Sequence, residues 1–282
     1  MSRRNRAIGL AAAGACALGF GTPAAAQTGP GLFQLKPLVE ARARYERVDQ
    51  DARDADALTF RIRAGAVVTI GDFAILGEAE GTAAAVNDYN AFPFPVPGES
   101  QSRPLYSVVP DPENLELNRL QIQYRAKNAT VTLGRQRINL DDQRWVGSVG
   151  WRQNEQTFDA LRAEAKLGPA ALDATYATSQ RTIFGEDAGR RTDYDGDFLF
   201  TGLSSKLGGL QGKLFAYLLD YEEPYLLANS SQTYGAILSG SLPLGGPAGI
   251  ALRASYARQS DHGDNPFDYS ADYWAIEGSS TL

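Results

Sequence analysis

The chain has 282 residues and a formal net charge of −6, so it has no basic excess with which to bind nucleic acid. Its single cysteine, Cys16, lies in an apolar N-terminal leader, which leaves the rest of the chain without thiols for disulfides, metal sites or nucleophilic catalysis. No stretch after residue 27 approaches the roughly 18 consecutive apolar residues of a spanning helix, so any membrane crossing must use β-strands.

The N-terminus has the features of a secretory signal peptide. Three arginines within the first six residues precede an apolar run from Ala7 to Phe20, and three alanines follow before Gln27. We predict a signal peptide over residues 1–26, exported by the general secretory route rather than the twin-arginine route. The mature domain is then residues 27–282, with no lipid on the leader cysteine.

The first part of the mature chain predicts three strands of a membrane barrel. Apolar residues take alternate positions along 39–45, 60–70 and 73–79, and polar or small residues fill the positions between them. A period of two with one apolar and one polar face is typical of strands that meet lipid on one side and water on the other. A Gly-Asp turn joins the second run to the third, and the Pro-rich segment 87–114 predicts a long outer loop.

The same alternation continues toward the C-terminus. Further strands are predicted around residues 120–124, 131–133, 161–167, 172–176, 198–207, 210–221, 234–242, 250–259 and 269–278. Short turns alternate with long polar connections, an asymmetry that outer-membrane barrels show between their periplasmic turns and outer loops. The predicted fold class is therefore all-β, an antiparallel transmembrane outer-membrane β-barrel with about twelve strands in this chain.

Arginine recurs on the polar faces of these strands, where it would line a water-filled interior. Such guanidinium groups could steer anions, or they could only pair with carboxylates on neighbouring strands and fix the register. The face of the strand on which Arg135 and Arg137 lie stays open. They alternate in step with the apolar Val131 and Leu133 and so would share their face, unless Gly134 marks a bulge that turns them inward. The predicted wall arginines are Arg42, Arg44, Arg61, Arg63, Arg162 and Arg253.

The segment Leu117–Ala160 carries two motifs that no strand or turn rule explains, G-R-Q-R-I-N at 134–139 and W-R-Q-N-E-Q-T-F-D-A at 151–160. In these motifs the chain resembles the alginate-export family of outer-membrane porins. The resemblance implies an 18-stranded barrel that exports an anionic uronate polysaccharide through an arginine-rich constriction. The implied path residues are Arg119, Arg135, Arg137, Arg144 and Arg152, with Asp141, Asp142, Glu155 and Asp159 as orienting carboxylates.

Members of that family are longer than this chain, whose last residues also lack the terminal aromatic that an outer-membrane strand usually has by that resemblance. We therefore expect the chain to be truncated at its C-terminus, within a barrel of about 16–18 strands.

The function predicted from these features is a channel in the outer membrane of a Gram-negative cell, surrounded by lipid. Anionic saccharides such as alginate or uronate oligomers would pass through it passively, without catalytic residues, metal or cofactor. The alternative is a polysaccharide-binding or polysaccharide-cleaving barrel enzyme or secreted β-protein, for which Asp141, Asp142 and Glu155 could supply paired carboxylates. Direction of transport, oligomeric state and protein partners are left open.

Three smaller features are also ambiguous. Trp145 and Trp151 could stack against sugar rings or lie in an interfacial girdle, whereas Trp274 fits a girdle or loop position better. The aspartates of the run 193–197 have calcium-like spacing but lack the bidentate glutamate of a complete loop. His262 is the only histidine, so a solvated loop role is expected for it.

Overall fold

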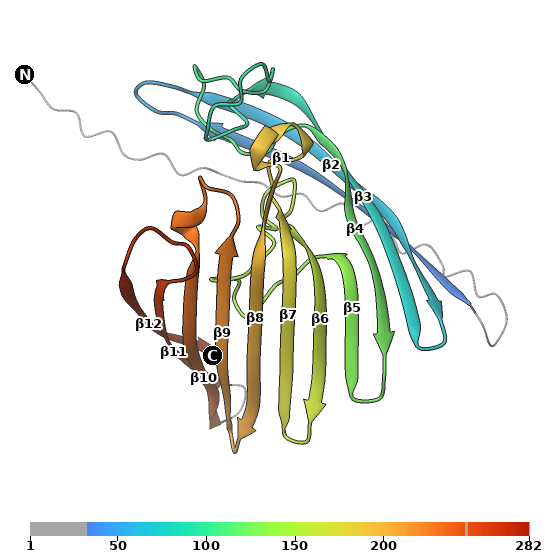
Figure 1. The fold of residues 1–282 in the computed structure, drawn as a ribbon, viewed down its shortest axis with the longest axis vertical. Coiled ribbons are helices and arrows are strands. Elements are labelled where there is room, and N and C mark those ends of the chain that lie inside the picture. Colours follow the sequence, from blue (N-terminus) through green and yellow to red (C-terminus); the bar gives the residue numbers. More distant parts are fainter. Residues whose placement is uncertain (1–32, 246–247, 282) are drawn as a thin grey trace, which may run out of the picture.

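Within the computed structural model, which describes residues 33–245 and 248–281, the strands form one antiparallel sheet (Figure 1). Each strand pairs with the next one along the chain, from β1 to β12. The predicted signal peptide lies outside the described residues. The strands are β1 Gln34–Val48, β2 Ala55–Ile70, β3 Phe73–Asp88, β4 Asn114–Arg125, β5 Ala129–Gln136, β6 Thr157–Leu167, β7 Ala170–Arg181, β8 Asp193–Leu207, β9 Leu210–Tyr221, β10 Ser231–Gly245, β11 Ala248–Asp261 and β12 Ser270–Thr281.

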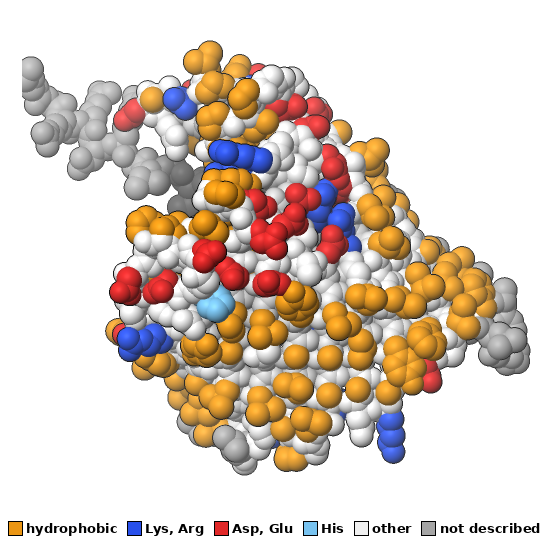
Figure 2. Space-filling model, viewed as in Figure 1, with side chains coloured by type: hydrophobic (Ala, Val, Ile, Leu, Met, Phe, Trp, Pro, Cys, Tyr) orange, Lys and Arg blue, Asp and Glu red, His pale blue; other side chains and the backbone are white. Residues whose placement is uncertain are grey.

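The period of two in the sequence separates the two faces of this sheet. On β2, Ile62 is 58% exposed while its neighbour Arg61 is 2% exposed, because successive side chains point to opposite faces. Apolar side chains cover the outer face of the strands, and acidic side chains gather toward the end that carries the long loops (Figure 2). An apolar outer face with polar residues inside is the arrangement of a membrane β-barrel.

The two ends of the sheet differ as predicted. Short turns follow β2, β4, β6 and β8, and long connections follow β3, β5, β7, β9 and β11 at the opposite end. Two of these connections contain short 3₁₀ segments, η1 Glu186–Arg191 and η2 Leu227–Asn229. In the described part of the chain, no helix is long and apolar enough to cross a membrane.

The β3–β4 and β7–β8 connections pack on each other at the long-loop end. Phe92 and Val109 are fully buried there, and the rings of Phe94 and Phe184 meet edge to face with centroids 4.8 Å apart. This apolar cluster orders the Pro-rich segment that was predicted to leave the sheet. The described strands curve without closing, since β1 and β12 each pair on one side only within the described residues.

The predicted fold is confirmed. All twelve expected runs are strands, and the hairpin register follows the alternation that was read from the sequence. One bulge affects the site below: the β3–β4 register shifts between Glu78 and Ala79, so that Asn118 has no partner of its own on β3. As a result, Asn118 and Arg119 both direct their side chains to Glu78 on the inner face.

Candidate functional site

The connection between β5 and β6, residues 137–156, folds back over the inner face of the sheet. We call this segment the inner loop. Residues 150–155 contact inward-facing side chains of β1, β2 and β3, whereas residues 141–145 contact inward-facing side chains of β9, β11 and β12. A segment that touches both ends of a curved sheet must lie on its concave side, and in Figure 1 it passes behind β6–β9.

The first anchor of the inner loop is on β1. Arg42 donates from Nη1 to the main-chain oxygens of Gly150 (3.0 Å) and Arg152 (3.1 Å), and from Nη2 to that of Trp151 (2.6 Å). Arg44 donates to the same Trp151 oxygen. A guanidinium carries five donors in a rigid fork, so one side chain can hold three consecutive carbonyl groups.

The second anchor is on β2 and β3 and is buried. Arg61 Nη1 donates to the main-chain oxygen of Gln153 at 3.1 Å, and Gln153 Nε2 donates to Thr59 Oγ1 at 2.8 Å. On β3, Thr82 Oγ1 donates to Asn154 Oδ1 at 2.7 Å. These bonds satisfy polar groups that would otherwise be costly to bury, and they fix the loop segment against the wall.

A cluster of charges completes this side of the site. Arg63 pairs with Glu80 and lies 3.3 Å from Glu155 Oε2, and Arg137 donates to the other oxygen of Glu155. Asn118 Nδ2 also donates to Glu155 Oε1 at 2.7 Å. The Glu155 side chain is only 1% exposed, so these partners replace the water contacts that its carboxyl group loses on burial.

Arg152 is held by two carboxylates on the same side. Its Nη1 lies 3.1 Å from Glu46 Oε2 and 3.6 Å from Asp111 Oδ2, and Asp111 also accepts from the Gln153 main-chain nitrogen at 2.9 Å. Burial lowers the pKa of Arg152 below its usual value, but an arginine stays charged at neutral pH. The side chain therefore positions the loop as a buried cation.

The opposite end of the inner loop is fixed to the far strands. Lys213 Nζ on β9 lies 2.8 Å from both oxygens of Asp141, and Arg253 Nη1 on β11 lies 3.2 Å from Asp142 Oδ2. The ring of Trp145 meets that of Tyr273 on β12 edge to face, with centroids 5.4 Å apart. The inner loop thus bridges β1–β3 to β9–β12 across the interior.

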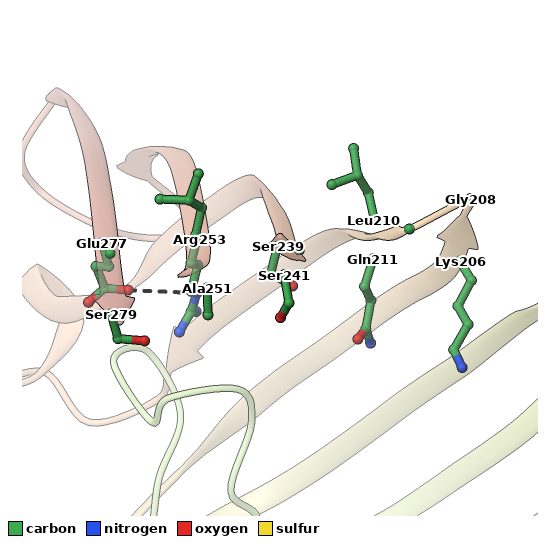
Figure 3. Close-up of a pocket in the computed structure, with 14 residues that line it drawn as sticks. Lys206, Gly208, Leu210, Gln211, Ser239, Ser241, Ala251, Arg253, Glu277 and Ser279 are labelled. Carbon is green, nitrogen blue, oxygen red and sulfur yellow. Dashed lines mark ion pairs between the residues drawn. The ribbon is translucent and has the colours of Figure 1, made fainter. Parts of the chain in front are cut away.

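Beyond this bridge, the inner face near the short turns stays open. A hollow of about 540 Å³ lies along β8–β12, lined largely by small residues. Gln211, Ser241 and Lys206 point to one side there, while Leu210 points to the other (Figure 3). This part of the wall leaves space on the same face that the inner loop fills further along the strands.

The predicted path residues and wall arginines fall into four groups. The inner loop and the wall beside it bring together Arg119, Arg137, Arg152 and Glu155 with wall arginines Arg42, Arg44, Arg61 and Arg63. A second group comprises Asp141, Asp142, Arg144 and Arg253. Arg162 stands apart on β6. Its Nε and Nη2 atoms donate to the two carboxylate oxygens of Asp173 on β7, at 3.0 and 2.6 Å, and Nη2 also lies 3.1 Å from Glu164 on its own strand. These contacts form a ladder of charges along the sheet.

Arg135 occupies a different position. Its guanidinium makes a bidentate pair with Asp159 at 2.9 and 2.8 Å. The β5 register runs without a shift through Gly134, so Arg135 shares the face of Leu133, and Asp159 shares that of Leu161. Both leucines are exposed on the outer face, which places this ion pair there at the long-loop end.

Several contributors to the site were not among the predicted site residues, and they include Asp111, Gln153, Asn154 and Lys213. Gln153 and Asn154 stand side by side in the motif W-R-Q-N-E-Q, and a pair of amides that no strand rule explains is a signal of buried polar contacts. Asp111 and Lys213 carry no comparable signal. In the described chain, no three His, Cys, Asp or Glu side chains are placed to hold a metal ion.

The family profile for alginate export matches residues 34–222, which include the inner loop and its anchors on β1–β3 and β9. The chain belongs to the alginate export family. Among curated proteins, none matches this chain. The family's named process is export rather than catalysis, and Asp141, Asp142 and Glu155 are each paired with a basic side chain. The enzyme alternative is therefore not retained.

Solved structures of the same fold come from outer-membrane proteins. Pseudomonas aeruginosa OccD3 (OpdP) is 15% identical with a TM-score of 0.60, over 93% of this chain and 57% of that one. Pseudomonas aeruginosa OccK2 (OpdF), solved in complex with glucuronate, is 16% identical with a TM-score of 0.60, over 88% and 61%. The outer membrane protein OpdK of the same organism is 14% identical with a TM-score of 0.62, over 89% and 65%. The chain thus spans less than two thirds of these relatives' length.

Proposed function

We propose that this protein forms a passive outer-membrane channel for anionic saccharides, such as alginate or uronate oligomers, with the inner loop as its constriction. The observation that carries the proposal is the position of the inner loop, which brings arginine and carboxylate side chains onto the concave face between opposite walls. The apolar outer face supports placement in outer-membrane lipid after removal of residues 1–26.

Accessibility separates the arginines that position the loop from those that meet solute. Arg44, Arg61 and Arg63 are at most 5% exposed beneath the loop, so their guanidinium groups are committed to it. The side chain of Arg144 keeps 45% exposure, that of Arg137 30% and that of Arg253 25%. These three, with Arg119 and Arg162, are among the cations that passing solute reaches.

The chemistry of these side chains favours carboxylated sugars. Guanidinium binds a carboxylate through two parallel hydrogen bonds, and low-dielectric walls strengthen the local field even in a protein of negative net charge. Each accessible arginine also has a carboxylate nearby, so none holds a passing anion so tightly that transport stops. A related fold crystallised with glucuronate supports the same solute class.

The test is ion selectivity across a planar bilayer. The reversal potential in a KCl gradient should show anion preference for the wild type, and a smaller preference for the double variant R144Q/R253Q. The matched control is Arg258→Gln, which changes the same residue type on β11 at an exposed position of the opposite face parity. Cation preference in the wild type, or an unaltered reversal potential in the double variant, would overturn the proposal.

A further inference from the structure

The surface of the inner loop has a hollow that the charge-based proposal does not use. Its volume is about 580 Å³, and its lining includes the side chains of Trp145, Trp151, Gln143, Gln156 and Asp142. One sugar ring or a short oligomer fits a space of this size, since small-molecule sites are typically a few hundred cubic ångströms. Two indoles with amide and carboxylate groups at one hollow are a combination suited to a polar molecule with apolar faces.

Trp151 is exposed in a place where its neighbours are not. Its side chain is 54% exposed, whereas Gln153 and Asn154 are fully buried and Arg152 is 9% exposed. The main chain of Trp151 is fixed by Arg42 and Arg44, so the ring is held in position at the loop surface. The indole is therefore presented to solvent at a fixed position on the inner side of the sheet.

One face of this indole is already occupied. The guanidinium carbons of Arg44 and Arg152 lie 4.3 and 3.8 Å from the ring centroid. Both arginines pair with the same Glu46 oxygen, and both lie near the same Asp111 oxygen, so they sit on one side of the ring. The exposure of the side chain therefore belongs to the opposite face and the edge.

We propose that this open face of Trp151 is a stacking platform for a pyranose ring, with the hollow as its subsite. The C–H face of the sugar covers the indole, and the Gln143 amide, which makes no hydrogen bond within the described chain, is available to its hydroxyl groups. Asp142 at the rim is paired with Arg253 at 3.2 Å and with Arg144 at 3.8 Å. A uronate stacked on Trp151 therefore has two guanidinium groups near the rim for its carboxylate.

The backbone of the hollow is strained in a way that fits a preformed site. Gln143 and Val149 both line it, and both have positive φ, 60° and 54°. This conformation is a genuine outlier for a β-branched residue such as Val149, and it persists only where the surroundings over-determine it. The anchors on β1–β3 and β9–β12 supply that constraint, so the subsite is formed before a ligand arrives.

This inference rests on the proposed function, because it places the subsite in the path of a saccharide channel. It adds a part of the recognition that does not depend on charge. A stacking platform binds the ring of a neutral sugar as well as that of a uronate, whereas the arginines distinguish only the uronate.

The experiment measures block of the ionic current through the reconstituted protein by three added solutes: digalacturonate, the neutral disaccharide cellobiose, and citrate as an anion without a pyranose ring. Both saccharides should block the wild type. Trp151→Ala should weaken the block by both saccharides about ten-fold, because the sugar loses its aromatic stacking surface, and Trp151→Phe should weaken it less. Citrate block should not depend on residue 151. The control is Trp274→Ala, which removes an indole that is 75% exposed on the outer face.

The outcomes separate the subsite from the charge preference. Equal saccharide block in the wild type, Trp151→Ala and Trp151→Phe would overturn the subsite and leave the wild-type reversal potential to decide the proposed function. A wild type without anion preference, still blocked by cellobiose through Trp151, would overturn the charge proposal and support the subsite. If Trp151→Ala fails to give the heat-modifiable band of a folded barrel, the comparison rests on Trp151→Phe and a Trp151→Leu variant.

Discussion

Arg61 on β2 donates a 3.1 Å hydrogen bond to the main-chain oxygen of Gln153, a residue 92 positions later in the chain. The donor is 2% exposed and the acceptor residue is fully buried, so the bond is shielded from water. Arg42 and Arg44 make the same kind of contact with the preceding carbonyl groups. The wall therefore holds the inner loop through its peptide oxygens.

Removing one of these donors should loosen the constriction. Arg61→Met leaves the Gln153 oxygen buried without this partner, at a cost of about 1–3 kcal/mol. We expect a larger and noisier single-channel conductance and a lower denaturant midpoint. Arg47→Met, at an exposed position on β1, is the control and should match the wild type. Identical conductance for both variants would show that the hydrogen bond from Arg61 to the inner loop does not set the width of the channel.

A new positive charge should destabilise the protein much more on the outer face of the sheet than on the inner face. Ile62→Lys puts an ammonium on the outer face at a position 58% exposed, where a lysine near the bilayer midplane costs about 2–4 kcal/mol. Ser239→Lys puts the same group beside the hollow of Figure 3, on the inner face, and should cost little. Urea unfolding in liposomes measures both. Equal losses of unfolding free energy in the two variants would contradict the assignment of a lipid-facing and a water-facing side of the sheet.

A backbone prediction concerns Gly134 on β5. It has φ of 111°, and a Cβ placed there would lie 2.4 Å from the main-chain oxygen of Leu120 on the paired strand. Gly134→Ala should destabilise the β4–β5 pairing by about 1–3 kcal/mol, because both the strained φ and the contact must be relieved. Gly77→Ala is the control, since its nearest contact would be a leucine methyl at 4.0 Å. The denaturant midpoint of unfolding should fall for Gly134→Ala and stay near the wild-type value for Gly77→Ala. Equal midpoints for the two variants would contradict the prediction.

Neutralising one carboxylate should strengthen the preference for anions. Asp142→Asn removes the partner that lies 3.2 Å from Arg253 and 3.8 Å from Arg144, and so frees two accessible guanidinium groups. These side chains are partly exposed, so little stability should be lost. The reversal potential should move further toward anion selectivity, while Asp272→Asn at an exposed position on β12 should not move it. A shift toward cations would argue against the roles given to both arginines.

Most of the fold could be predicted from the sequence because strand periodicity is local. The alternation through 60–70 and the Gly-Asp turn at 71–72 identify a hairpin without any distant contact. The facing of Arg135 could not be predicted in the same way. It depended on whether Gly134 shifts the register, and the observed pairing shows that it does not.

The site was harder to predict than the strands because its contacts are distant in sequence. The motif around Trp151 indicated a functional segment but not its contacts. The hydrogen bond from Arg42 to Gly150 spans 108 positions, and that from Lys213 to Asp141 spans 72. Parity correctly places Arg44 and Arg61 on the inner face. It cannot show that a loop, rather than solute, covers them.

Hydrogen bonds to main-chain oxygens do not depend on which side chains the accepting residues carry. Arg42 would bind the carbonyl groups at positions 150–152 whichever amino acids stood there, provided that the backbone kept its path. A substitution at position 151 therefore keeps these main-chain hydrogen bonds, although it removes the stacking of the Arg44 guanidinium on the indole. Channels with the same wall and inner loop could change the solute that they bind through substitutions at position 151 alone. This position is therefore a suitable target for engineering solute preference.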